Sequence, residues 1–281
     1  VFIAIACAAN ILLDCLFMGV FHMGPAGAAL GTTLSQAISV AISLFMIRRY
    51  RLGITLAREQ LRPRWEVIRK LLRIGVPIAL QDGFIQVAFL VITVIANERG
   101  ITDAAAVGIV EKIISFIFLV PSSLLSTVSA LGAQNIGAHQ PERARAILET
   151  ALKTALGFGA LMILLMQPAA PAFVGTFTSD SAVISAGAPY LRGYIVDVLF
   201  AGVHFSFSGY FCAWGRSEFS FIHNVISIVL ARIPLVYAAS KAFPYTLLPM
   251  GLATACGSLV SVLICMGLFR KLRRKNACTM L

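Results

Sequence analysis

The chain has 281 residues, of which 59% are hydrophobic and only 12% are charged, and its mean hydropathy is +0.88. Soluble domains carry about 25% charged residues, so this composition excludes an ordinary soluble globule and predicts a chain that crosses the membrane repeatedly. The net charge of +11 does not indicate a nucleic-acid partner, because the basic residues gather beside apolar runs, mainly within Arg48–Arg73 and Arg270–Lys275.

Apolar runs follow one another along the whole chain. A helix that crosses the bilayer needs about 20 mostly apolar residues. Eight runs approach or exceed this length, so the sequence predicts an all-α polytopic membrane protein with about eight transmembrane helices. The predicted spans are Val1–Val20, Ala26–Ile47, Ile74–Ala96, Ala104–Leu131, Ala146–Val174, Ala182–Ala213, Phe219–Ala239 and Thr246–Phe269.

The connections between these spans alternate in charge. Most Lys and Arg residues lie in every second connection and in the tail that follows residue 270. Because basic loops remain on the cytoplasmic side, we expect an integral membrane protein with a cytoplasmic C-terminus. The longest connection, 49–73, is predicted to contain an amphipathic helix at the membrane interface after Pro63; a bare basic linker is the alternative.

The first predicted span carries an aspartate among apolar residues. An ionisable group at the bilayer centre costs roughly 2.5–3.5 kcal/mol on insertion scales. Asn10 lies four residues before Asp14 on the same helix face, and Thr32 and Thr33 follow on the next span after a short turn. Carboxylate, amide and hydroxyl oxygens suit a small cation such as Na⁺, with Asp14 as the charged ligand, or Asp14 could carry a titrating proton. A structural polar contact between the two helices is the alternative.

Two further spans carry polar stripes. A stripe that contains an aspartate and a histidine cannot face lipid, so it faces either the bundle interior or a water-filled cavity, and we favour the cavity. On the span 182–213 the stripe consists of Tyr190, Tyr194, Asp197, His204 and Ser208. On the span 74–96 the polar residues are Asp82, Gln86, Thr93 and Asn97, with Phe89 between them.

We predict that both stripes contribute to a substrate cavity. Phe89 offers an aromatic face to a hydrophobic cation, although core packing is the alternative for this residue. The predicted cavity residues are Asp82, Gln86, Phe89, Tyr194, Asp197 and His204.

Other ionisable residues in the spans leave alternatives open. Arg232 either snorkels towards the interface or pairs with an acid such as Asp197. Glu111 could take part in a gate or a salt bridge, and His223 is expected near an interface without a role. The sequence contains no G-x-S-x-G, H-E-x-x-H or Walker pattern. We therefore expect no enzyme activity and no cofactor, apart from Na⁺ or H⁺ as a coupling ion.

Four stretches, in order, resemble the multidrug and toxic compound extrusion (MATE) family. They are NILLDCLFMGVFHMGPAGAALGTTLSQ, LLRIGVPIALQ, LVPSSLLSTVSALGAQNIGAHQPERAR and ARIPLVY. The resemblance implies a twelve-helix transporter with two six-helix lobes. On this basis 1–48 would be the last two helices of the N-lobe, 49–73 the linker, 74–270 a complete six-helix C-lobe and 271–281 a cytoplasmic tail. Segments 27–49 and 251–271, which both open with Gly-x-Ala and end in basic residues, fit such a repeat and lead us to expect that the chain is N-terminally truncated by four helices.

The resemblance also implies an activity. Family members export organic cations and other amphipathic compounds in exchange for Na⁺ or H⁺, and Asn10, Asp14 and Thr32 match the family's N-lobe cation site. We expect a monomer in a bacterial plasma membrane. The alternatives are a flippase for lipid-linked precursors or polysaccharides from the related superfamily, and a fragment that transports nothing by itself.

Overall fold

The structure is a computed structural model that describes residues 2–49 and 63–279, and every regular element in these ranges is helical. Six helices are long and apolar enough to cross a membrane, or seven when the bent helix α7 (Ser181–Ala213) counts as one span. The run predicted as the first span contains a shorter apolar helix, Ile5–Val20. The all-α membrane fold predicted from the sequence is therefore confirmed, although the count of eight is approximate.

The chain divides between Arg64 and Trp65 into two compact units. The first unit contains a helical hairpin. Helix α1 (Phe2–Asp14) continues into the π-helix η1 (Cys15–Val20), the chain turns, and α2 (Gly24–Arg49) runs back beside α1.

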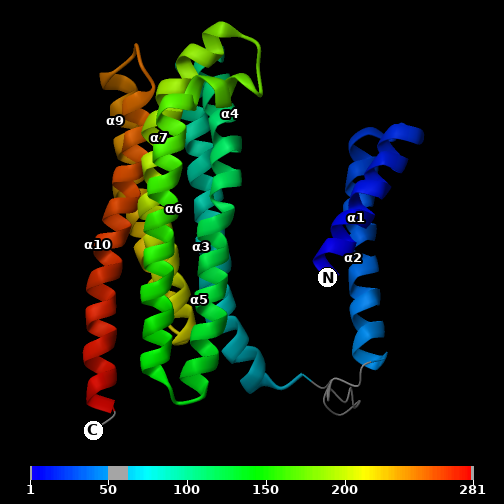
Figure 1. Ribbon diagram of the computed structural model, residues 1–281, viewed down its shortest axis with the longest axis vertical. Helices are drawn as coiled ribbons and strands as arrows, with labels where there is room; N and C mark the ends of the chain where they lie inside the picture. Colours follow the sequence, from blue (N-terminus) through cyan, green and yellow to red (C-terminus); the bar gives the residue numbers. More distant parts are fainter. Residues whose placement is uncertain (1, 50–62, 280–281) are drawn as a thin grey trace. The chain divides into compact units, whose positions relative to one another are not determined.

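The second unit is a bundle of helices that run along a common direction (Figure 1). Helix α7 lies at its centre and packs against α4, α5, α6 and α10. The bounds are α3 Trp65–Asn97, α4 Ile101–Ile117, α5 Leu119–Gly137, α6 Pro141–Gly175, α8 Ser217–Ser227, the π-helix η2 Ile228–Arg232, α9 Ile233–Ala242 and α10 Leu248–Thr279.

Glycines allow the helices of the second unit to approach closely. A Cβ atom added to Gly251 of α10 would lie 2.5 Å from the carbonyl oxygen of Tyr190, and one added to Gly209 of α7 would lie 2.5 Å from that of Leu125. In a membrane, where lipid is as apolar as the helix surface, such close backbone packing is a main source of helix association. These contacts explain how α7 can be surrounded on several sides.

Three predicted spans are broken or bent. The run 104–131 is divided at Phe118 into α4 and α5, and the run 219–239 is divided into α8, η2 and α9. Helix α7 bends by 42° between its parts Ser181–Tyr194 and Asp197–Ala213. Breaks and π-segments within spans are frequent at functional sites, because they expose backbone groups and redirect side chains.

Two prolines free carbonyl groups that side chains then satisfy. Pro77 has no N–H for the carbonyl of Arg73, and the Ser217 hydroxyl donates to that oxygen at 3.2 Å. Pro171 likewise frees the carbonyl of Gln167, which accepts from Nε of Arg192 at 3.0 Å. Because lipid offers no hydrogen bonds, such pairings are what make proline tolerable within a span.

The predicted interfacial helix is not a separate element. Helix α3 begins at Trp65 and continues without a break to Asn97, so the apolar residues expected at the interface form its first turns. The side chains of Trp65 and Leu71 are exposed there. Pro77 does not end the helix, because Ser217 satisfies the carbonyl that it frees. The part of the predicted linker at 50–62 lies outside the described residues.

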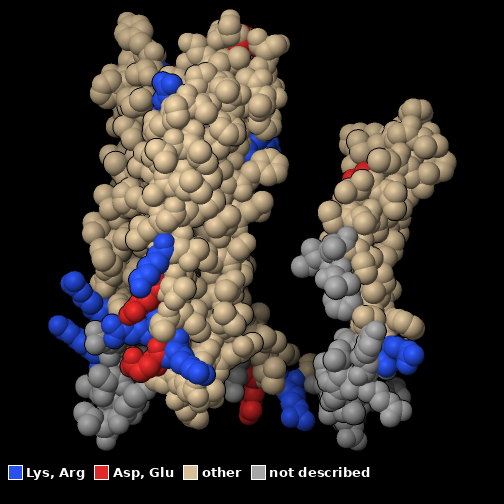
Figure 2. Space-filling view, in the orientation of Figure 1, with Lys and Arg blue, Asp and Glu red and all other residues tan. Residues whose placement is uncertain are grey.

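Charged side chains gather at one end of the second unit. Figure 2 shows, on the visible face, a group of Lys, Arg, Asp and Glu side chains at the end where α5 meets α6 and where α10 approaches the C-terminus. The rest of this face shows few charges. This distribution is typical of a bundle whose middle is surrounded by lipid.

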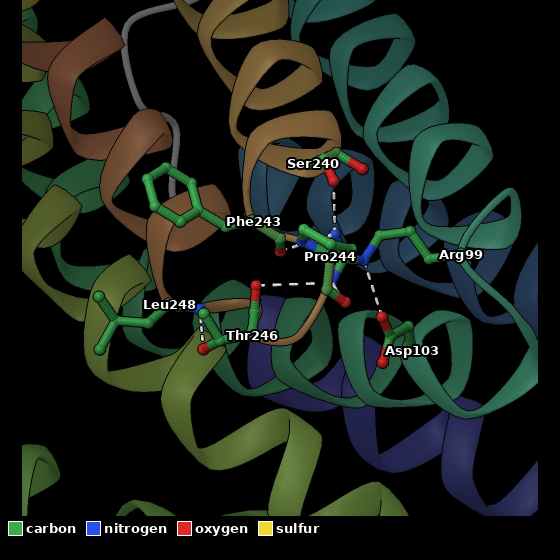
Figure 3. A network of polar contacts seen from close by, with 7 residues as sticks. All are labelled: Arg99, Asp103, Ser240, Phe243, Pro244, Thr246 and Leu248. Carbon is green, nitrogen blue, oxygen red and sulfur yellow. Dashed lines mark hydrogen bonds and ion pairs between the residues drawn. The ribbon is translucent and has the colours of Figure 1, made fainter.

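A clamp formed by Arg99 joins the connections at the opposite end (Figure 3). The guanidinium donates to Asp103 at 2.7 Å and to the carbonyl of Ser240 at 2.7 Å. It also donates to carbonyls of the α9–α10 connection, including that of Pro244 at 2.8 Å. The α3–α4 turn is thereby fastened to the end of α9, where the last carbonyls of a helix lack partners of their own.

Candidate functional site

A buried ion pair lies in the interior of the second unit. Asp197 of α7 has no exposed surface, and Nη2 of Arg232 donates to its Oδ2 at 2.5 Å. The same guanidinium lies 5.8 Å from the ring centroid of Tyr194. Of the two alternatives for Arg232, the structure therefore shows pairing with Asp197.

Irregular helix geometry positions this ion pair. Asp197 follows directly after the 42° bend of α7, and Arg232 is the last residue of η2. Gly257 of α10 makes room beside Arg232, since a Cβ atom there would lie 2.8 Å from the arginine Cβ. Three helical segments thus bring together two charges that are 35 residues apart in sequence.

A second carboxylate, that of Glu111, lies in the same unit. Glu111 of α4 accepts a hydrogen bond from Thr93 of α3 at 3.4 Å. One oxygen of Glu111, Oδ1 of Asp197 and Nε of Arg232 are buried without a hydrogen-bond partner among the described residues. Buried polar atoms without partners are costly within a bilayer, so these three groups are candidates for a functional role.

A second group of buried polar side chains, centred on His223, lies in the interior of the same unit. Ser208 and Ser261 lie 2.9 and 2.7 Å from the two ring nitrogens of His223, and the ring of His204 lies 5.7 Å from that of His223. The side chain of His223 is fully buried in the bundle, and its expected position near a membrane interface stays a prediction. The spacing of Ser220, His223, Asn224 and Ser227 on one helix face was the sequence signal that could have revealed this burial.

The polar stripe of α7 is buried inside the second unit. Tyr194 and His204 are buried like Asp197. The cavity beside them has a volume of about 50 Å³ and is lined in part by Phe89, His204 and Arg232. Sites for drug-sized ligands usually measure about 300–1,000 Å³, so this cavity by itself suits water-sized molecules. The stripe is enclosed in this unit, and the favoured interpretation that it faces a water-filled cavity stays a prediction.

The remaining predicted cavity residues lie on α3. Asp82 and Gln86 are exposed, whereas Phe89 is half-buried and packs against the core of the unit. The structure therefore separates the predicted set: Asp82 and Gln86 are accessible from outside the unit, and Tyr194, Asp197 and His204 are enclosed.

The predicted cation-site residues lie in the first unit. Asp14 is the last residue of α1, at the junction with η1, and its Oδ1 and the Nδ2 of Asn10 are buried without a partner in the described part of the chain. Gly31 of α2 packs directly against the Asp14 carboxylate. The hydroxyl of Thr32, the next residue, donates to the carbonyl of Ala28 at 3.0 Å.

This arrangement limits what the site could bind. Asn10 and Asp14 share one helix face, and the two helices meet where Gly31 lacks a side chain. Among the described residues there is no group of three or more His, Cys, Asp or Glu placed to hold a metal ion. A cation bound at Asp14 would therefore need amide, hydroxyl or backbone oxygens as its other ligands, which is compatible with Na⁺.

These features define the class of the protein. A bundle of apolar helices with bent and broken spans, which carries ionisable groups in its interior, is typical of an integral membrane transporter. Its residues 77–238 match the MatE family model, and the chain belongs to this family, the multidrug and toxic compound extrusion family that its motifs resemble. The relatives of the chain are transporters and not enzymes.

Similar proteins support this membership. The chain is 28% identical over 234 residues to the probable multidrug resistance protein YpnP of Bacillus subtilis, a match that covers 83% of this chain and 52% of the relative. It is 28% identical over 271 residues to the FAD transporter of Shewanella oneidensis, a match that covers 89% of this chain and 58% of that relative. The chain thus spans about half the length of the curated relatives that it matches.

A solved structure has the same fold. A MATE protein crystallised in complex with MaL6 superposes with a TM-score of 0.88 at 18% identity, over 97% of this chain and 61% of the other. At this identity the likeness establishes the fold alone.

Proposed function

We propose that the protein is a secondary efflux transporter that exports organic cations and other amphipathic compounds in exchange for Na⁺ or H⁺. The observation that carries the proposal is the coincidence of MatE family membership with ionisable groups in the interior of bent and broken spans. Buried acids within the membrane are costly, and they recur where ions and substrates pass.

The exchange would depend on Asp14 in the first unit. Occupancy of Asp14, Asn10 and Thr32 by a cation, or of Asp14 by a proton, would favour one packing of α1 against α2, and cargo would favour another. A ligand can shift such an equilibrium only by its different affinity for the two states. The close packing of Gly31 against the Asp14 carboxylate supports this role, because any change in the charge of Asp14 is felt directly by α2.

The second unit would supply the cargo surface. The exposed Asp82 and Gln86 on α3 would meet a cationic cargo, with Phe89 behind them. Tyr194, Asp197 and His204, which are enclosed in the unit, would not contact the cargo from outside but would stabilise the bend of α7. The basic end of the bundle, with the C-terminus, would lie in the cytoplasm of a bacterial cell and the chain would act as a monomer.

Transport by the chain in proteoliposomes tests the proposal. An inward Na⁺ or H⁺ gradient is expected to drive the movement of a cationic dye in the opposite direction, and Asp14→Asn is expected to reduce the initial rate at least about tenfold, since the charged state is lost. Asp180→Asn, at an exposed helix cap, is the matched control. Equal rates in the Asp14 variant and in the control would contradict coupling at Asp14.

A relative that carries an anion suggests a second candidate. One similar protein is named as an FAD transporter. FAD is a large anion, so a flavin efflux assay run beside the dye assay distinguishes the two cargo classes. If the gradient drives movement of flavin but not of the dye, the cargo of the proposed transporter is anionic and not an organic cation.

A further inference from the structure

A long groove lies between α5 and α6 on the surface of the second unit. It has a volume of about 470 Å³. Its walls include Leu124 and Leu131 of α5 and Ile147 of α6, and its floor includes the buried Val128 and Ala151. The groove arises because both helices pack mainly on α7, while small side chains line the space between them.

The length of the groove is close to the depth of one leaflet of a bilayer. It begins beside the turn that joins α5 to α6, at Arg143, and extends along α6 to Thr154. Eleven residues of helix rise about 16 Å, and the hydrocarbon region of one leaflet is about 15 Å deep. Both helices belong to segments that are long and apolar enough to cross the membrane.

The interior of the groove is apolar despite its polar residue types. The hydroxyls of Thr150 and Thr154 donate to carbonyls of their own helix at 2.9 and 3.0 Å. The amide of Asn135 donates in the same way to the carbonyl of Leu131 at 2.8 Å. These bonds turn the polar atoms towards the backbone, so the groove presents mainly methyl and methylene groups.

The mouth of the groove carries an unpaired positive charge. Nη1 of Arg143 donates to the neutral amide oxygen of Gln140 at 3.0 Å, and Arg143 forms no ion pair with any residue that the structure describes. Arg145, two residues further along, pairs instead with Glu149 at 2.9 Å. No acidic residue lines the groove. The charge therefore favours an anion and opposes a cationic cargo.

We infer that the α5–α6 groove binds an anionic phospholipid, with one acyl chain along the groove and the headgroup phosphate at Arg143. The acyl chain fits the apolar floor and walls. The phosphate, at the level of the headgroups, accepts hydrogen bonds from the N–H groups of the guanidinium that have no other acceptor. Such a lipid is a ligand of the bundle itself and is independent of the proposed transport activity.

Lipid retention by the purified chain tests this inference. Native mass spectrometry in detergent compares binding of phosphatidylglycerol with that of phosphatidylcholine, and thermal unfolding measures the stabilisation by each lipid. Two variants address the groove: Arg143→Gln removes the charge at an exposed position, and Ala146→Phe fills the groove from an exposed position on its wall. Arg145→Gln and Ala160→Phe are the matched controls on the same helix.

The chain is expected to retain phosphatidylglycerol in preference to phosphatidylcholine. Arg143→Gln should weaken binding of phosphatidylglycerol about tenfold and remove the preference, as expected for the loss of a charge-assisted hydrogen bond. Ala146→Phe should abolish retention of both lipids, and the two controls should behave as the unchanged chain does.

Several results would overturn the inference. Retention of phosphatidylglycerol by both groove variants at the level of the controls would show that the lipid binds elsewhere. Equal stabilisation by glycerol phosphate, which has no acyl chain, would reduce the site to an anion contact. Displacement of the lipid by tetraphenylphosphonium would assign the groove to cationic cargo. The Arg143 comparison remains decisive if Ala146→Phe does not fold.

Discussion

The clamp at Arg99 allows a stability prediction with a magnitude. Arg99→Ala removes the hydrogen bonds to Asp103 and to the carbonyl of Ser240 from a side chain that is 8% exposed. Hydrogen bonds to charged groups contribute about 1.5–3 kcal/mol each, and water can replace the bonds to the exposed α9–α10 connection. For the two remaining bonds, the expected loss of unfolding free energy is about 3–6 kcal/mol. Arg99→Lys keeps the charge but not the forked geometry of the guanidinium. Its unfolding free energy should lie between those of the unchanged chain and of Arg99→Ala.

Chemical unfolding in detergent micelles, followed by circular dichroism, measures this loss. Lys241→Ala is the matched control, because Lys241 joins the same two segments through Glu98 at 3.0 Å, with side chains that are 57% and 52% exposed. Exposed pairs contribute little, so this variant should unfold nearly as the unchanged chain does. Hydrogen exchange at Phe243 should become faster only in the Arg99 variants. If Arg99→Ala and Lys241→Ala unfold at the same denaturant concentration, the clamp does not stabilise the bundle.

Two further predictions concern the interior of the second unit. Asp197→Asn should destabilise the bundle by about 3–5 kcal/mol, because it leaves the guanidinium of Arg232 buried without its counter-charge. The double variant Asp197→Leu, Arg232→Met should recover most of this loss in the same unfolding assay. A double variant that is no more stable than the single variant would contradict the reasoning. Gly251→Ala should cost about 1–3 kcal/mol, since its Cβ would lie 2.5 Å from a carbonyl oxygen of α7. Gly267→Ala on the same helix meets nothing within 4 Å and should stabilise by about 0.5–1 kcal/mol, so equal effects at the two glycines would refute the packing argument.

The sequence alone was sufficient for the class of the protein. Apolar runs of about 20 residues and few charges predict a polytopic helical bundle, because a helix of this length crosses the bilayer and satisfies its backbone hydrogen bonds within one segment. The same physics makes each acid within a run conspicuous, so Asp14 and Asp197 could be singled out from local sequence. The pairing of Asn10 and Asp14 on one face was likewise predictable, because it depends only on helical periodicity.

Only the tertiary structure decided what those groups meet. Arg232 reaches Asp197 because α7 bends and η2 adds a π-turn, and neither irregularity follows from hydropathy. His223 is buried because serines on two other helices face its ring nitrogens. Periodicity determines which side chains share one face of a helix, whereas the partner of that face depends on close packing between helices that are distant in sequence. That packing determined that the α7 stripe is enclosed while Asp82 and Gln86 remain exposed.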